Sequence, residues 1–269
     1  MDTKKQAVHD FWNQASCGEE LYLSGTDKAN YIDQAKSRYK LEGQMIYGLA
    51  QFTKAKGLKV LEVGVGLGAD HQQFAEAGAE LYGIDLTERA VEHTRRRLDA
   101  FNLQSNITMG DAENLDYKDN IFDIVYSWGV LHHSPNTPKA INEVWRVLKP
   151  GGVARIMIYH KWSMIGFMLW VRYGVLRCRP WISLTKIYAG YLESPGTKAY
   201  SRTEAARLFH AFKDVRISTP VCHSDLLESA AGQRHRGLLL QISKTLWPRW
   251  FIRRFLPNAG LAMLIEATK

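Results

Sequence analysis

The sequence Val60-Leu-Glu-Val-Gly-Val-Gly-Leu-Gly68 joins a short apolar strand to a turn with glycine at every second position. Because glycine has no Cβ, the main chain of such a turn can approach a ligand closely. The G-x-G-x-G spacing differs from the G-x-G-x-x-G of dinucleotide-binding turns. Glu62 lies near the end of the strand, where a buried carboxylate is unusual and suited to hold a cationic group.

Two further carboxylates follow the next two strands. Asp85 ends the second strand, 21 residues after Gly64. A carboxylate in that place can accept hydrogen bonds from both ribose hydroxyls, which fits an adenosine ligand. Asp111 follows the third strand in Gly110-Asp-Ala-Glu113 and can accept from the adenine amino group. A helix cap at Asp85 and a turn at Asp111 are the alternatives.

Strand and helix patterns alternate along the chain. The expected strands are residues 59–63, 80–84, 107–109, 122–127, 153–159, 214–218 and 261–267. The expected helices between them are residues 69–77, 87–101, 137–148 and 201–212. Residues 1–50 have a helical pattern of their own. This alternation predicts an α/β fold with a mostly parallel sheet and helices on both faces.

Basic residues gather in two segments. The chain has 269 residues and a net charge of +8, and its composition excludes disordered and fibrous proteins. Segments 161–192 and 230–258 hold five and six Lys or Arg residues, no acid and many aromatic side chains. That combination favours contact with a partner that is both anionic and apolar, an amphiphilic substrate or an anionic membrane surface. The alternative is a lid whose basic heads stay solvated.

The cysteines and the N-terminus carry less information. Cys17, Cys178 and Cys222 are too far apart in sequence for a disulfide framework or a zinc ribbon, and no other ligand spacing indicates a metal. The first twelve residues lack the apolar core of a signal peptide, and the longest apolar run is too short to span a membrane. We therefore expect a cytoplasmic protein, with peripheral membrane association as an option.

Several motifs occur together in order. They are the 62–68 turn, Asp85, Gly110–Glu113, Phe122-Asp-Ile-Val-Tyr-Ser127, Gly129-Val-Leu-His-His-Ser-Pro135 and Leu148-Lys-Pro-Gly-Gly152. As a set they resemble a class I S-adenosylmethionine-dependent methyltransferase of the small-molecule type 11 family, related to quinone-biosynthesis methyltransferases. The resemblance implies a Rossmann-like sheet of seven strands in the order 3-2-1-4-5-7-6, with strand 7 antiparallel. It also implies a helical cap at 1–50 and a methyltransferase domain at 51–269, with lid insertions at about 161–200 and 219–259.

The resemblance also implies the roles of residues around S-adenosyl-L-methionine, which would leave as S-adenosyl-L-homocysteine. The methionine moiety would be held by Glu62, Gly64, Gly66 and Gly68. Asp85 with Leu86 would hold the ribose, and Asp111, Ala112 and Glu113 the adenine end. Ser127 and Trp128 would lie beside the sulfonium, and Trp12 or Tyr39 would fold over the cofactor.

The acceptor is less defined. His132, His133, Tyr159 and His160 follow the fourth and fifth strands, and each is a candidate base for a small-molecule acceptor. A purely structural role is the alternative for the histidine pair. Methylation at O, N, S or C stays open, as does a monomer or a homodimer. The competing functions are a nicotinamide-dependent oxidoreductase and an RNA methyltransferase. A nucleic acid partner is not favoured, because Ser127-Trp-Gly-Val lacks the Asn/Asp-Pro-Pro-aromatic motif common in such enzymes.

Overall fold

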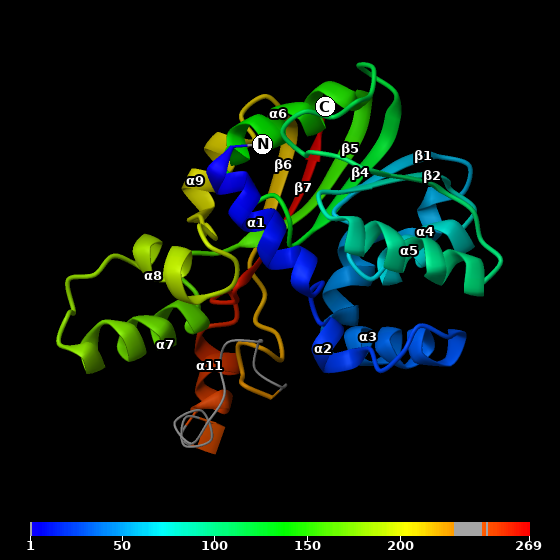
Figure 1. The fold of residues 1–269 in the computed structure, drawn as a ribbon. Helices are drawn as coiled ribbons and strands as arrows, with labels where there is room; N and C mark the ends of the chain where they lie inside the picture. The colour runs from blue at the N-terminus through cyan, green and yellow to red at the C-terminus, as the bar shows by residue number, and fades with distance from the viewer. Residues whose placement is uncertain (1, 229–243, 246) are drawn as a thin grey trace.

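A seven-stranded sheet forms the centre of the computed structural model, which describes residues 2–228, 244–245 and 247–269 (Figure 1). Its strands are β1 (Lys59–Val63), β2 (Glu80–Asp85), β3 (Asn106–Met109), β4 (Phe122–Trp128), β5 (Leu148–Tyr159), β6 (Lys213–Ser218) and β7 (Ala262–Thr268). Their order is β3-β2-β1-β4-β5-β7-β6. β7 runs antiparallel to β5 and β6, and the other neighbouring strands are parallel. The expected α/β architecture and strand order are confirmed.

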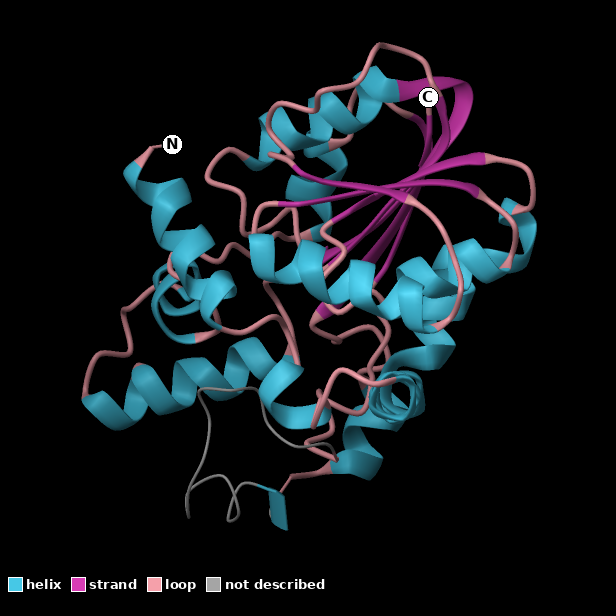
Figure 2. Cartoon of the chain, turned by 45° about the vertical axis from the view of Figure 1, so that its right-hand side comes forward, coloured by secondary structure: helices cyan, strands magenta, loops and turns pink. Residues whose placement is uncertain are grey.

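Helices lie around the sheet, and short 3-10 turns complete the set (Figure 2). The N-terminal helices are α1 (Thr3–Gln14), α2 (Glu19–Tyr22) and α3 (Lys28–Ala50). Those that connect strands are α4 (Ala69–Glu76), α5 (Glu88–Ala100), α6 (Thr137–Val147) and α9 (Arg202–Leu208). The remaining elements are α7 (Met164–Tyr173), α8 (Leu184–Tyr191), α11 (Arg249–Phe255), η1 (Phe52–Ala55) and η2 (Val175–Arg177). In the described ranges, none of the helices combines the length and hydropathy that a membrane span needs.

Two apolar layers sandwich the sheet. Neighbouring strand residues point to opposite faces, so Leu61 packs in one layer and Val60 in the other. The Leu61 layer includes residues of α6 and α9, whereas the Val60 layer includes residues of α3, η1 and α4. The α/β pattern thus buries both faces and leaves the ends of the strands free to carry a site.

Local signals in the sequence explain where several helices begin. Thr87 caps α5 by accepting from the Ala90 amide, and Ser201 with Glu204 forms the expected capping box of α9. Two details of the α6 region differ from the sequence pattern. Leu148 belongs to β5, because it pairs with Phe122 in the sheet. Trp145, which the helical spacing places inward, is 36% exposed, and the Lys269 ammonium lies 4.0 Å from its ring centroid.

The two basic segments build a lid beside the sheet. Along the chain, α7, η2 and α8 follow β5 and precede α9, and α11 follows β6 and precedes β7 (Figure 1). Residues 230–243 of the second segment lie outside the described residues. The lid has its own apolar core, in which Leu169 of α7, Ile187 of α8, Leu227 and Trp247 pack together. The described parts of both insertions therefore pack into one structure, although they come from separate stretches of the chain.

Candidate functional site

A cavity of about 440 Å³ runs along the carboxyl ends of β2, β1, β4 and β5. This volume is typical of sites for small molecules and cofactors. Its walls come from the glycine-rich turn, the loops after β2 and β3, α1 to α3, and the lid. The cavity therefore joins the carboxyl-end edge of an open α/β sheet to the two inserted segments.

The glycine-rich turn lines the cavity through Gly64 and Gly66. Gly64 has φ +85°, and a Cβ there would collide with the Val130 side chain. Gly66 has φ +53°, and among the described residues no atom lies within 4 Å of a Cβ built there. Gly66 therefore leaves its side of the turn open to a ligand. Gly68 lies behind the wall, where a Cβ would come within 2.9 Å of Thr94, so this glycine lets α4 and α5 pack together.

Asp85 lines the cavity next to Leu86 and is held in place by the turn. Its Oδ2 accepts from the Gly66 amide at 3.2 Å, and its Oδ1 accepts from the Thr87 amide and hydroxyl at 3.0 and 2.9 Å. Burial raises the pKa of Asp85, and these hydrogen bonds oppose that shift. The result is a fixed, partly dehydrated acceptor group at the end of β2.

Glu62 also lines the cavity, and its partner is a histidine that the sequence analysis did not identify. The Nδ1 atom of His71 lies 2.8 Å from Glu62 Oε2, and the Nε2 atom of His71 lies 2.8 Å from Ser105 Oγ. Burial raises the pKa of Glu62 and lowers that of His71 to about 3. His71 is therefore neutral at pH 7 and does not supply a positive charge to Glu62.

Asp111 and Ala112 line the cavity after β3, where α1 closes over them. The Lys5 ammonium of α1 lies 2.6 Å from Asp111 Oδ2 and 2.8 Å from Glu113 Oε2. Glu113 lies behind the wall and accepts from the Asn136 amide at 2.7 Å. It thus fastens α1 to the loop before α6, and its contacts with protein groups account for its burial.

Of the two aromatic candidates from the cap, only Trp12 lies in the cavity wall. Its ring stands edge-to-face with that of His133, with ring centroids 5.2 Å apart. Tyr39 does not line the cavity, and its hydroxyl donates at 3.1 Å to Oδ1 of Asp70, which does. Arg38 donates to the same carboxylate from Nε and Nη2, at 3.1 and 2.7 Å. Tyr39 therefore belongs to a buried polar cluster that holds α3 on α4.

Ser127 and Trp128 at the end of β4 have different roles: the first is structural, and the second faces the cavity. Ser127 is fully buried, and its hydroxyl donates to the Val63 carbonyl at 2.8 Å, which ties β4 to β1. Trp128, the next residue, lines the cavity. Because strand residues alternate between faces, these neighbours cannot both contact the same ligand through their side chains.

Three polar residues, Tyr159, His133 and Glu193, line the part of the cavity that lies next to the lid. The Tyr159 hydroxyl donates to Glu193 Oε2 at 2.7 Å, and His133 Nε2 lies 3.3 Å from the same oxygen. The other nitrogen of His133, Nδ1, lies 2.8 Å from Ser194 Oγ and 3.1 Å from Thr197 Oγ1. Burial raises the pKa of Tyr159, so its phenol remains a hydrogen-bond donor. Glu193 was not identified from the sequence, because the loop after α8 carries no recognised motif.

The two other candidate bases lie behind the wall. His132 is fully buried, and its ring is tilted against those of His133 and Tyr159, with centroids 4.2 and 4.0 Å away. The Nδ1 atom of His160 lies 3.1 Å from the Gly260 carbonyl, and this contact holds the turn into β7. Neither imidazole faces the cavity, so we do not assign a base to either of them.

His132, His133 and Glu193 also bring one potential ligand atom each within 4.8 Å of one another. We assign no metal to this group, because Glu193 Oε2 already accepts from the Tyr159 hydroxyl and the two histidines are adjacent in the chain. The expectation from ligand spacing that the chain holds no metal stays a prediction.

Comparisons with known proteins agree with this architecture. The model of the type 11 methyltransferase-domain family matches residues 61–156. A sterol 24-C-methyltransferase from Yarrowia lipolytica is 31% identical over 58% of this chain and 40% of its own length, so the chain spans less than half of that relative. A demethylmenaquinone methyltransferase from Desulfitobacterium hafniense is 28% identical over 71% of this chain and 85% of its own length.

The solved structures lead to the same fold. A geranyl diphosphate C-methyltransferase from Streptomyces coelicolor, solved with Mg²⁺, geranyl diphosphate and S-adenosyl-L-homocysteine, superposes with a TM-score of 0.62. The two proteins are 14% identical, and the match covers 99% of this chain and 98% of the other. The domain match does not support the nicotinamide-dependent oxidoreductase alternative. Residues 61–156 of this chain are thus a methyltransferase domain of type 11, and the fold around them is shared with the solved methyltransferase from Streptomyces coelicolor.

Proposed function

We propose that this chain transfers the methyl group of S-adenosyl-L-methionine, the methyl donor of its family, to a small amphiphilic acceptor bound under the lid. The observation that carries the proposal is the continuous cavity from the Gly66 turn to the group of Tyr159, His133 and Glu193. From β2 to β5 the sheet edge spans three strand spacings, roughly 14 Å. That length suits an extended cofactor with an acceptor at its methyl end.

The walls of the cavity support one direction for the cofactor. The ribose would lie on Asp85 and Leu86, with the adenine toward Asp111 and Ala112. The methionine moiety would follow Gly64 and Gly66 toward Glu62, and the sulfonium would lie beside Trp128, beneath Trp12. Gly68, Glu113, Ser127 and Tyr39 drop out of this set, because each of them packs or bonds within the protein behind the wall.

The acceptor side is mainly apolar. Its apolar wall residues are Phe11, Leu21, Met45, Ile165, Met168, Leu192, Leu227 and Leu261. Glu42 and Glu193 also line this side, together with Arg38 and Lys244, and Arg38 lies 3.5 Å from Glu42. Burial raises the pKa of Glu42. This arrangement favours an acceptor with an apolar body and one polar reactive end. The sterol and demethylmenaquinone relatives are named for lipid-soluble acceptors of this general kind.

For methyl transfer, the protein mainly has to align the acceptor atom, the methyl carbon and the sulfur. The acceptor atom forms a bond to the methyl carbon as the carbon–sulfur bond breaks, and the sulfonium becomes a neutral thioether. Holding the three atoms in line, in a site that excludes water, supplies most of the rate enhancement. Where the acceptor atom loses a proton, Glu193 is placed to accept it, since Tyr159 orients its carboxylate and His133 lies beside it. Oxygen, nitrogen, sulfur and carbon acceptors all fit this scheme.

The test is methyl transfer from radiolabelled S-adenosyl-L-methionine to a panel of amphiphilic phenols, amines and isoprenoids, with products identified by mass spectrometry. With an acceptor in hand, Glu193→Gln should lower kcat about 100-fold and alter its pH profile, while the Kd for the cofactor stays unchanged. Glu92→Gln, an exposed substitution on α5, is the matched control. No labelled product with any acceptor, or an unchanged kcat and pH profile in Glu193→Gln, would contradict the proposal.

A further inference from the structure

The outer side of the lid exposes an unusual number of large apolar side chains. The most exposed are Trp162 (65%), Phe167 (53%), Leu176 (63%), Trp181 (80%), Trp250 (72%), Phe251 (48%) and Phe255 (55%). We call residues 162–186 and 249–256 with these side chains the lid surface. Isolated exposed apolar residues are ordinary, but a concentration on two neighbouring insertions indicates an interaction site.

These side chains are not left over from a poorly packed core. The inner side of α7 and α8 is already buried, with Leu169, Ile187 and Tyr188 at 0% exposure. α11 buries only Ile252, and its exposed rings contact one another, with Phe251 and Phe255 centroids 4.9 Å apart. The lid thus has one apolar side turned to its own core and a second apolar side turned to solvent.

The charge of the lid surface has one sign. Segments 161–192 and 244–258 contain no Asp or Glu. Among the described residues, no acidic side chain pairs with Arg172, Arg177, Arg179, Lys186 or Arg254. Two basic residues of these segments do have acidic partners: Lys161 pairs with Glu204, and Arg253 pairs with Glu228. Unpaired cations among exposed aromatic rings match the headgroup and upper acyl region of an anionic lipid leaflet.

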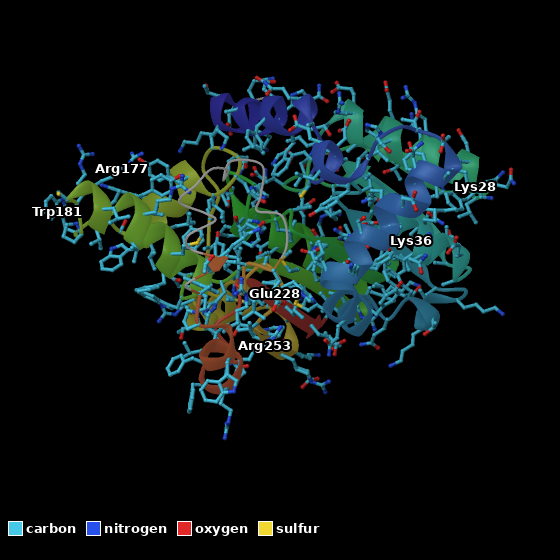
Figure 3. The ribbon with its side chains drawn as sticks, turned by 90° about the horizontal axis from the view of Figure 1, so that it is seen from below. Lys28, Lys36, Arg177, Trp181, Glu228 and Arg253 are labelled. Carbon is cyan, nitrogen blue, oxygen red and sulfur yellow. The ribbon has the colours of Figure 1, made fainter. Side chains whose placement is uncertain are left out.

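Figure 3 shows how these groups lie. Arg177 and Trp181 project from the outer end of the lid, and Arg253 projects from α11 toward Glu228. Lys28 and Lys36 of α3 lie on the opposite side of the molecule (Figure 3). The basic and aromatic groups of the lid therefore lie far from Lys28 and Lys36, which offer a matched control.

We infer that the lid surface docks on an anionic membrane and that the acceptor enters the cavity from that membrane. The first part rests on the lid surface alone, and the second rests on the proposed function. The link between them is α7, whose Ile165 and Met168 line the cavity while its Phe167 faces solvent, as does Trp162 just before the helix. Leu192 and Leu227, from the same lid core, continue the apolar wall inward. An amphiphile leaving the leaflet would therefore pass from one apolar environment directly into another.

A second copy of this chain is a weaker candidate for the partner. A lid surface facing its own copy would bring unpaired cations together without an acidic complement, which disfavours association. An anionic leaflet instead neutralises the cations and accepts the aromatic rings. Nucleic acid would neutralise the cations but would leave most of the apolar area in water.

Flotation of the full chain with vesicles tests the docking. Phosphatidylcholine vesicles with 30% phosphatidylglycerol should bind it at least about ten times more strongly than pure phosphatidylcholine, and added salt should weaken that difference. Arg179→Glu with Lys186→Glu should lower binding to the anionic vesicles about tenfold. Lys28→Glu with Lys36→Glu changes the net charge equally and should lower it less than about twofold. Trp181→Ala with Trp250→Ala should weaken binding to both kinds of vesicle.

Several results would overturn the docking. They are no vesicle binding by the wild type, equal losses in both charge variants, a dimer that the tryptophan pair dissociates, and salt-dependent binding to RNA that exceeds binding to vesicles. The Kd for S-adenosyl-L-methionine, measured on every variant, separates this inference from the proposed function. Normal methyl transfer without vesicle binding would contradict only the docking, whereas vesicle binding without methyl transfer would contradict only the proposed function.

Discussion

The two ends of the cavity are built in different ways. At the β1–β2 end, a short contiguous turn and Asp85 present main-chain groups and one anchored carboxylate. At the lid end, the walls come from α1, α3, α7 and two loops that are far apart in the chain, and most of them are apolar side chains. One end can therefore recognise a polar molecule by backbone geometry, while the other selects a ligand by its shape and apolar area.

The glycine-rich turn and the lid can therefore change independently of each other. The glycine-rich turn is constrained by φ angles and by its contacts with Val130 and Thr94, so substitutions there disturb the fold as well as the ligand. The lid has a separate apolar core and can vary without moving the turn. We therefore expect variants of the glycine-rich turn to affect cofactor binding and variants of the lid to affect acceptor binding.

The largest expected effect is at Gly64. Gly64→Ala forces a left-handed φ on alanine and a collision with Val130, and should destabilise the fold by about 2–4 kcal/mol and abolish cofactor binding. Gly66→Ala is the companion variant, because its Cβ would enter open space. It should remain folded within roughly 1–2 kcal/mol of the wild type, yet bind S-adenosyl-L-methionine far more weakly. Thermal denaturation and calorimetric titration separate the two effects, and a Gly66→Ala protein with normal cofactor affinity would break the comparison.

The next effect concerns Asp85. Asp85→Ala removes an anchored acceptor from the proposed ribose site and should weaken cofactor binding by about 1.5–3 kcal/mol, roughly ten- to a hundredfold. Calorimetric titration measures this, and the lid should keep its vesicle binding. Unchanged cofactor affinity in a folded Asp85→Ala protein would remove the ribose assignment.

A pair of neighbours on α7 tests the lid end. Met168 lines the cavity, whereas Phe167 is 53% exposed on the lid surface. Met168→Asp places a charge in an apolar wall and should raise the acceptor KM about tenfold with the cofactor Kd unchanged. Phe167→Asp should leave that KM in detergent solution unchanged and reduce vesicle binding. The same KM for both variants would mean that Met168 and Phe167 do not lie on separate sides of α7, one in the cavity and one on the lid surface.

The smallest effect concerns the attachment of the cap. Burial alone would raise the pKa of Glu19, but hydrogen bonds from the Arg89 side chain and the Ser16 amide outweigh it and hold the pKa at about 2. A carboxylate whose pKa is lowered on folding stabilises the protein above its ordinary pKa near 4.5, and that stabilisation is lost as the pH falls toward 2.

Glu19→Gln should therefore lower the free energy of unfolding by on the order of 1–2 kcal/mol at pH 7, and the difference should vanish near pH 2. Denaturation by urea at several pH values measures it. A difference that is constant with pH would show that the ion pair with Arg89 does not hold the cap.

The cofactor end was largely predictable from the sequence, because its residues are neighbours in the chain. The glycine turn, Asp85 and Asp111 follow strand ends, and parallel strands bring those ends to one edge. Burial and partners were not predictable in the same way. Nothing in the local sequence separates Trp128 from Ser127, or shows that the His71 imidazole lies against Glu62.

The acceptor end was less predictable, because it depends on tertiary contacts. Glu193 reaches Tyr159 and His133 only because the loop after α8 folds back over β5. Four adjacent or nearly adjacent candidates for a base could not be ranked from the sequence, and the structure leaves His133 and Tyr159 in the wall. The positions of His132 and His160 follow from packing around their rings, which spacing along the chain does not encode.

The most direct test of the central claim is a crystal structure of the chain with S-adenosyl-L-homocysteine. We expect the ribose hydroxyls on the Asp85 carboxylate, the homocysteine chain along Gly64 and Gly66, and the sulfur beside Trp128, facing Tyr159 and Glu193. A ligand bound among the apolar residues of α7 and Leu227, with Asp85 unoccupied, would contradict the division of the cavity into a cofactor end and an acceptor end.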